Sequence, residues 1–444
     1  MFKTLVNAFK IEQLRKRLFF TFWIVVIVRL GSQLPIPGID VSQVQAFLES
    51  VVGDSFSFID SFTGGSFLSM SVFALSVTPY ITASIIMQLL TIAIPFLEEM
   101  QKDGEDGRKK IASLTRYVTV ILSLIQATAM TIGFGNTRLP DGSTLLAEYN
   151  ALNVITCISA LVAGSMFVMW IGETITEKGI GNGISIVLVI NIISRLPQDL
   201  SQLFKQFVVG KPPATAILAA VVILLVIILM VVLVIILNAG VRKIPVQYAK
   251  KMQGRKMVGG QTSNIPLKIN TSGVIPVIFA SSIMQTPLII ASFMGKGNGT
   301  GVGAEIMKYL SSQNWCDPKQ IKYSGGLVVY MLLVIFFAYF YTSVTFNPMM
   351  VADNLKKQGG FIPGIRPGKP TTEYLNKVLK YIIFIGAVGL LIICVLPFVF
   401  SGVFNANVSF GGTSLIIIVS VVLETVKQLE SQMLVRNYKG FLND

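Results

Sequence analysis

Residues 79–88 read PYITASIIMQ, and residues 276–285, nearly two hundred positions later, read PVIFASSIMQ. Seven of the ten positions are identical, including the prolines Pro79 and Pro276 that open the two stretches. Convergence of common membrane residues around a helix-starting proline is one explanation of this match. The alternative is that the chain contains a duplicated half.

The composition places both stretches in a membrane. Of the 444 residues, 53% are hydrophobic and 13% are charged, whereas soluble proteins average about 25% charged residues. The apolar runs have a helical rather than an alternating pattern, and only helices or closed barrels satisfy the backbone inside lipid. The sequence therefore predicts an all-α membrane protein with ten transmembrane helices, near 19–35, 68–96, 117–135, 151–172, 184–203, 214–239, 274–294, 325–347, 379–402 and 413–430.

The two matching stretches fall in the second and seventh predicted spans, which divides the chain into five plus five. An odd number of spans per half forces the halves into opposite orientations, so we expect two inverted five-helix halves. We assign residues 1–205 to the N-terminal half and residues 206–444 to the C-terminal half. The two matching helices should then meet at the interface between the halves, where a path through the membrane is expected.

The orientation follows from the basic residues, most of which fall on one side of the membrane if the N-terminus is cytoplasmic. The richest segments on that side are two long loops, 241–272 and 348–378. The stretch 34–67 has no Lys or Arg, carries Asp60 among its acidic residues, and is expected outside. No small-residue cleavage site follows the first apolar run, so we expect an uncleaved first span. The distribution of basic residues predicts both termini in the cytoplasm.

Ionisable residues are scarce within the predicted spans, whereas a secondary transporter usually binds protons, ions or a charged substrate at depth. Four such residues lie near predicted span ends, where snorkelling is the ordinary explanation: Arg29, Glu173, Arg195 and Glu424. The matching helices offer small residues beside β-branched aliphatics. These residues suit helix packing, or a constriction that excludes water and ions.

No catalytic or cofactor chemistry is indicated. The chain has no histidine, and Cys157, Cys316 and Cys394 stand far apart, so neither a zinc site nor a disulfide framework is supported. No nucleotide-binding loop is found, so we expect no enzyme and no cofactor, and the energy for any transport must come from a partner. A secondary transporter of a small solute stays open as the alternative function.

In combination and order, several motifs resemble the SecY family of protein-translocation channels, and the resemblance extends throughout the chain. They are ALSVTPYITASI at 74–85, GIGNGIS at 179–185, GVIPVIFASS at 273–282, FNP at 346–348, ADNLKK at 352–357, GIRPG at 364–368 and FGGTSL at 410–415.

The resemblance implies an hourglass channel for unfolded polypeptides. Its waist would be a ring of aliphatic side chains from the second, fifth, seventh and tenth spans: Val77, Ile81, Leu188, Ile278 and Ile417. It also implies that the segment at about 57–71, with Gly64 and Gly65, folds back as a plug beneath this ring. Glycines and serines there allow a marginal, displaceable helix, while the other interpretation is an ordinary external loop.

The second and seventh spans would form a lateral gate, through which sufficiently apolar segments pass into the membrane lipid. Gln88 and Asn270 are candidates for polar contacts that hold this gate closed, or else each is a solvated helix end or a local cap.

The two basic loops predict a docking face. Arg255 and Lys256 follow Gly254 at a turn, and Arg366 lies between two prolines, so both tips should be held stiffly. Such charge can also be the ordinary positive-inside signal. The resemblance implies docking of the ribosome or of the SecA motor ATPase, small SecE-like and SecG-like membrane subunits, and a nascent or secretory polypeptide as the substrate. It implies location in a bacterial plasma membrane.

Overall fold

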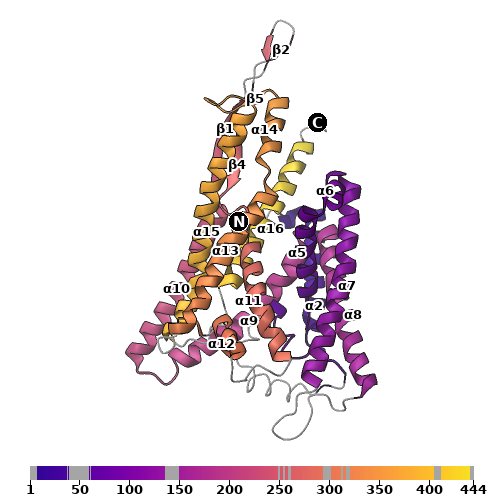
Figure 1. The fold of residues 1–444 in the computed structure, drawn as a ribbon, viewed down its shortest axis with the longest axis vertical. Coiled ribbons are helices and arrows are strands. Elements are labelled where there is room, and N and C mark those ends of the chain that lie inside the picture. Colours follow the sequence, from indigo (N-terminus) through magenta and orange to yellow (C-terminus); the bar gives the residue numbers. More distant parts are fainter. Residues whose placement is uncertain are drawn as a thin grey trace.

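Long helices dominate the computed structural model, and a small β-structure lies at one end of the molecule (Figure 1). The structure describes residues 8–37, 39, 60, 62–135, 150–248, 251–253, 256–258, 262–293, 302–311, 314–316, 321–404 and 412–440. The predicted helical fold is therefore confirmed.

Each predicted span coincides with a helix. In chain order these are α2 (Glu12–Gly31), α5 (Thr78–Ala93), α7 (Glu105–Gly135), α8 (Ala151–Lys178), α9 (Gly183–Phe207), α10 (Pro213–Ala239), α11 (Ile275–Phe293), α13 (Gly325–Thr345), α15 (Lys369–Phe404) and α16 (Gly412–Gly440).

Length and hydropathy support part of the predicted span count. Among the described residues, six helical stretches are long and apolar enough to cross a membrane, and α5 with its continuation α6 (Pro95–Lys102) makes a bent seventh. Helix α2 is not among them, because four arginine and lysine residues lie within its 20 residues. In α11, the stretch Ile275–Met284 is apolar but short. The chain is a multi-pass membrane protein, and the count of ten remains a prediction.

The two halves pack in the same way. In the N-terminal half, α5 packs on α7, α7 on α8 and α8 on α9, while α2 lies against α8 and α9. In the C-terminal half, α11 packs on α13, α13 on α15 and α15 on α16, while α10 lies against α15 and α16. Each contact between two helices of the first half therefore has a counterpart between the two helices that come five spans later. This correspondence supports a duplicated half over convergence of one short motif.

The repeated motif also has a repeated burial pattern. Pro79, Ala83 and Met87 of α5 are buried, and so are their counterparts Pro276, Ala280 and Met284 of α11. Ile81 and Ile278, the two ring candidates, are half-buried at matching positions. These four identical pairs therefore have matching burial in the two halves.

The second helix is shorter than the predicted span 68–96. Turns occupy residues 64–70 and 72–77, and two non-glycine residues, Met70 and Ser76, have φ values of 43° and 48°. The left-handed region interrupts a helix, so α5 begins only at Thr78. At its far end α6 leaves α5 with a bend of 101°, where Pro95 breaks the helical hydrogen bonding.

The two basic loops come together in a sheet that the all-helical prediction left out. Strand β1 (Val241–Tyr248) pairs antiparallel with β4 (Thr262–Lys268) and, at its other edge, with β5 (Gly360–Phe361). A hairpin of β2 (Lys251–Gln253) and β3 (Lys256–Val258) continues beyond it (Figure 1). The core under the sheet is apolar, and it draws residues from β1, β4, helix α14 (Pro348–Lys357) and α15: Ile244, Val246, Leu267, Ala352, Leu355, Leu375 and Val378.

Candidate functional site

The five ring candidates lie in two apolar clusters. Val77 and Leu188 are buried in the first, with Ile81 packed against it. Ile417 is buried in the second, with Ile278 packed against it. Phe62 packs against both clusters. The ring candidates from α5, α9, α11 and α16 thus belong to two clusters that Phe62 and Ile186 both contact.

A strained turn places Val77 next to the start of α5. The φ of the preceding residue, Ser76, is 48°, a conformation that non-glycine residues adopt only when their surroundings hold it. Asn191 of α9 donates a hydrogen bond to the Ser76 hydroxyl at 3.0 Å, and Ser165 of α8 donates to the Ser76 carbonyl at 3.2 Å. Two neighbouring helices therefore fix the backbone that presents Val77.

The segment predicted to be a plug is described at Asp60 and at residues 62–71, and we call this part the 60–71 segment. Phe62 and Thr63 are helical and the residues from Gly64 to Met70 form turns, so the expected helix is mostly replaced by turns. Residues 57–59 and 61 lie outside the described residues.

Asp60 organises the 60–71 segment. Its carboxylate accepts a hydrogen bond from the Leu68 backbone N–H at 2.9 Å, and its carbonyl accepts bonds from the Thr63 hydroxyl and the Gly65 backbone N–H. The base of the segment is fastened to the chain after α2, where the Ile36 N–H donates to the Met70 carbonyl and the Val72 N–H to the Leu34 carbonyl.

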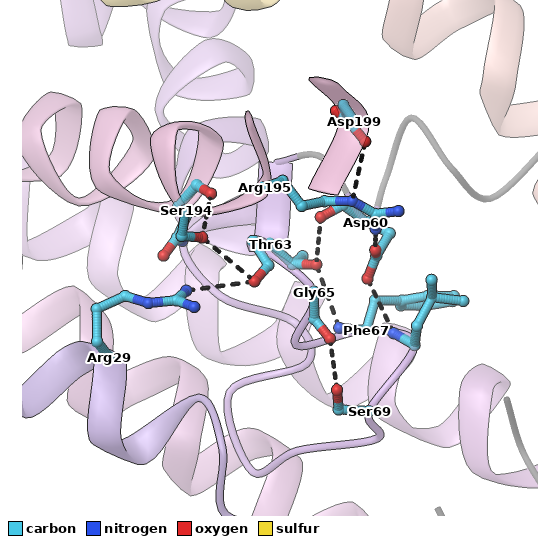
Figure 2. Close-up of polar contacts among 12 residues, drawn as sticks. Arg29, Asp60, Thr63, Gly65, Phe67, Ser69, Ser194, Arg195 and Asp199 are labelled. Carbon is cyan, nitrogen blue, oxygen red and sulfur yellow. Dashed lines mark hydrogen bonds and ion pairs between the residues drawn. The ribbon is translucent and has the colours of Figure 1, made fainter. Parts of the chain in front are cut away.

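An ion pair joins this segment to α9 (Figure 2). The Asp60 carboxylate is fully buried and contacts the guanidinium of Arg195, whose side chain is 12% exposed. Asp199, one turn further along α9, lies 3.9 Å from Nε of the same guanidinium. A buried charge requires a partner of opposite sign, and here one arginine has two.

A second arginine holds the middle of the segment. Nη1 of Arg29, on α2, donates a hydrogen bond to the Gly64 carbonyl at 3.2 Å, and the Ser194 hydroxyl approaches the same carbonyl at 3.5 Å (Figure 2). Gly64 has a φ of +69°, and an added Cβ would lie 2.8 Å from the Asn191 backbone. Only glycine fits there. At the other glycine of the predicted plug, Gly65, φ is +87° and a Cβ would have no neighbour within 4 Å.

These contacts correct two interpretations made from the sequence. Arg29 and Arg195 do not snorkel, because both bond the 60–71 segment. Asp60, counted among the acidic residues of an external loop, is buried inside the molecule. The partner Asp199 was overlooked, although it lies within the predicted fifth span and four residues after Arg195. That i,i+4 spacing of opposite charges was the available signal.

The two polar gate candidates do not meet. Asn270 donates to Oδ1 of Asn238 at 2.9 Å, and Asn238 donates to Ser420, so this chain of bonds stays within the C-terminal half. Gln88 is exposed, and among the described residues no hydrogen bond joins it to Asn270. The contact of α5 with the other half is apolar instead. Ile85 and Leu89 pack against the cluster that contains Val277, Ala280 and Met284 of α11.

The basic tips lie at the β-structured end of the molecule. Arg366 is exposed in the turn between β5 and α15, and the Thr371 hydroxyl donates to its carbonyl at 2.8 Å. Lys256 begins β3, and Arg255 lies outside the described residues. The hairpin that contains Lys256 projects furthest from the helices (Figure 1). Within the described part of the chain, no group of three or more His, Cys, Asp or Glu residues could hold a metal ion.

Comparison with known proteins agrees with this geometry. The SecY family profile matches residues 71–426. The protein translocase subunit SecY of Streptomyces galbus is 43% identical over 454 residues, covering 100% of both chains.

Solved structures share the fold. A SecY channel described by a plug domain that stabilises the closed state superposes with a TM-score of 0.59, at 17% identity, covering 94% of this chain and 92% of the other. Sec61 in the canine ribosome–channel complex gives a TM-score of 0.56 at 15% identity, with the same coverages. The sequence match, which spans the whole chain, shows that this protein belongs to the SecY family.

Proposed function

We propose that the chain is the central pore-forming subunit of a Sec translocon, which conducts unfolded secretory polypeptides across the membrane and releases apolar segments sideways into lipid. Membership of the SecY family over the full length carries this proposal. The two apolar clusters that hold the ring candidates and that both contact Phe62 support a narrow apolar path.

The proposed pore waist consists of Val77, Ile81, Leu188, Ile278 and Ile417. Aliphatic side chains form no hydrogen bonds with water or ions, so a narrow ring of them empties of water and blocks ions. The same side chains offer no specific contact to a passing polypeptide. A ring of this kind therefore seals an idle channel without selecting among sequences.

The 60–71 segment is the proposed plug. Its Phe62 packs against both ring clusters, so the segment closes the space between the two sets of ring residues. Turns held by side-chain bonds, rather than a long helix, are expected to detach at low cost. Gly64 and Gly65 supply the left-handed conformations that this compact path requires.

The lateral gate is proposed to run along α5 and α11, where Ile85 and Leu89 meet the C-terminal half. Because this seam is apolar, separating its two sides in lipid leaves no polar group without a partner. A polypeptide segment can then replace protein contacts with equivalent lipid contacts. Gln88 and Asn270 remain proposed gate residues, although no hydrogen bond between them is found in the described structure.

The β-structured end is the proposed docking face for the ribosome and for a SecA motor ATPase. Arg255, Lys256 and Arg366 would supply positive charge toward acidic surfaces, in agreement with the exposure of Arg366. The shared apolar core of the two loops makes this face a single body. Contacts of this type weaken as salt screens them.

We infer that the chain lies in a bacterial plasma membrane with both termini in the cytoplasm. The concentration of basic residues in the loops of the β-structured end supports this orientation. The exposed apolar faces of the helices, such as Leu218, Leu225 and Ile236 of α10, suit lipid and small SecE-like and SecG-like subunits.

A secondary transporter of a small solute is the competing function. The buried Asp60, Arg195 and Asp199 are the kind of group it would need, but family membership favours the channel. Reconstituted vesicles discriminate between the two. A channel of this kind moves an unfolded secretory chain only when its motor partner and ATP are added. Saturable uptake of a small solute by the chain alone would overturn the proposal.

A further inference from the structure

One guanidinium lies between two carboxylates that belong to different parts of the chain. Asp60 is in the 60–71 segment, whereas Asp199 is on α9, the helix that also carries Arg195. If the segment leaves its place, Asp60 leaves with it, while Asp199 stays four residues from Arg195. Asp60 would therefore contact Arg195 only while the segment is in place, whereas Asp199 would stay beside Arg195 in both states.

The low solvent exposure of the three side chains explains why Arg195 needs a second carboxylate when Asp60 leaves. The Asp60, Arg195 and Asp199 side chains are 0%, 12% and 4% exposed, so these charges are nearly withdrawn from water. Breaking a buried ion pair is strongly unfavourable when it leaves one charge without a counter-charge. Here Asp60 would move toward water, where a carboxylate is well solvated, and Arg195 would keep the carboxylate of Asp199.

We propose that Asp60, Arg195 and Asp199 form a charge-exchange latch. In the closed state Arg195 binds Asp60 and holds the 60–71 segment in place. On opening, Arg195 turns fully to Asp199, so the latch releases without stranding a buried charge. The proposal rests on the proposed role of the segment as the plug.

The hydrogen bond from Arg29 complements this latch. Arg29 donates to the neutral carbonyl of Gly64, so breaking that bond separates no opposite charges. The two arginines approach the segment from different helices, α2 and α9 (Figure 2). Arg29 therefore helps to position the loop, while the charge balance between the closed and open states depends on Arg195 and its two carboxylates.

The latch predicts opposite effects for two isosteric substitutions. Asp60→Asn keeps an acceptor for the Leu68 N–H but removes the charge that holds Arg195, so ion leakage through the idle channel should rise on the order of tenfold. Asp199→Asn removes the charge that receives Arg195 on opening. It should lower leakage, which is best measured in a channel already made leaky by Phe62→Ala.

The measurement is ion conductance of the complete, purified channel complex in planar bilayers, with assembly of each variant checked by gel filtration. Glu305→Gln serves as the matched control, because it removes one carboxylate from an exposed ion pair with Lys322. It should leave conductance unchanged. If Asp60→Asn assembles poorly, the comparison of Phe62→Ala with Phe62→Ala plus Asp199→Asn still tests the latch.

The outcomes separate the latch from the proposed function. Ile278→Gly should leak whether or not the latch exists, because it opens the ring. If Ile278→Gly leaks but the two aspartate variants shift conductance in the same direction, or not at all, the latch is wrong and the pore assignment stands. If Ile278→Gly does not leak either, the proposed function itself fails.

Discussion

The contact of Phe62 with both halves of the proposed ring gives a direct test of how the channel is sealed. Phe62→Ala removes an aromatic side chain that packs against both clusters, as Ile186 of α9 also does. Full burial of a phenylalanine side chain contributes about 1.5–3 kcal/mol, and Phe62 is half-buried, so its contribution is about 0.75–1.5 kcal/mol. That stabilisation exists only while the segment is in place.

The expected effect follows from this difference between states. Losing about 0.75–1.5 kcal/mol from the closed state alone raises the open population roughly 3.5- to 12-fold. The assay is the ion conductance of idle channels in planar bilayers, measured without motor, ribosome or substrate. A rise within this range, with normal assembly, would support the sealing role.

The control is Phe22→Ala on α2. Phe22 is 60% exposed on the molecular surface, so the same atoms are removed without touching the ring. Equal leakage from both variants, or wild-type conductance in Phe62→Ala, would refute the reasoning, because the effect would not depend on the position of Phe62 between the clusters.

Three further predictions test other parts of the structure. The first variants carry single cysteines at positions 81 and 278 in a chain whose three native cysteines are replaced. Each new cysteine should crosslink to a stalled translocating polypeptide. Failure at both positions would make the pore assignment wrong. Gly164→Ala should lower the thermal stability of the complex in detergent by several degrees, because its Cβ would lie 2.0 Å from the Val72 carbonyl oxygen. Gly325→Ala should cost less, because its Cβ would meet only Tyr309, at 3.6 Å. Arg366→Glu should weaken motor-driven translocation and ribosome binding at low salt, while the conductance of the idle channel stays unchanged. The control is Lys322→Glu, near α12 (Val302–Leu310) at the opposite end of the molecule. An equal loss in both variants would exclude a specific docking role for Arg366.

Much of the fold follows from the sequence because apolar runs and their periodicity decide helices in a membrane. The match between Pro79–Gln88 and Pro276–Gln285 predicted which helices correspond, and the contacts within the two halves agree with it. Helix ends were less predictable. The run 68–96 is apolar throughout, and only the backbone conformations at Met70 and Ser76 show that its first part is not helical.

The site was predicted in part. All five ring candidates lie in the two clusters that share Phe62, although their role in a pore stays a proposal. The polar fastening of the 60–71 segment was missed, since Asp60 and Arg195 are 135 positions apart in the sequence and periodicity within a helix cannot relate them. The pairing of β1 with β5 was missed for a different reason, because the two residues of β5 are too few for a strand pattern.

That pairing has a consequence for biosynthesis. Gln247 pairs with Phe361 and Tyr248 with Gly360, so β1 acquires its second edge partner only after more than a hundred further residues have been made. During that interval the emerging chain already contains Lys256 but lacks α14 and the first turns of α15, whose side chains complete the apolar core beneath the sheet. A partly synthesised copy therefore lacks the complete sheet and its core, and the proposed docking face is finished only once the start of α15 has been made.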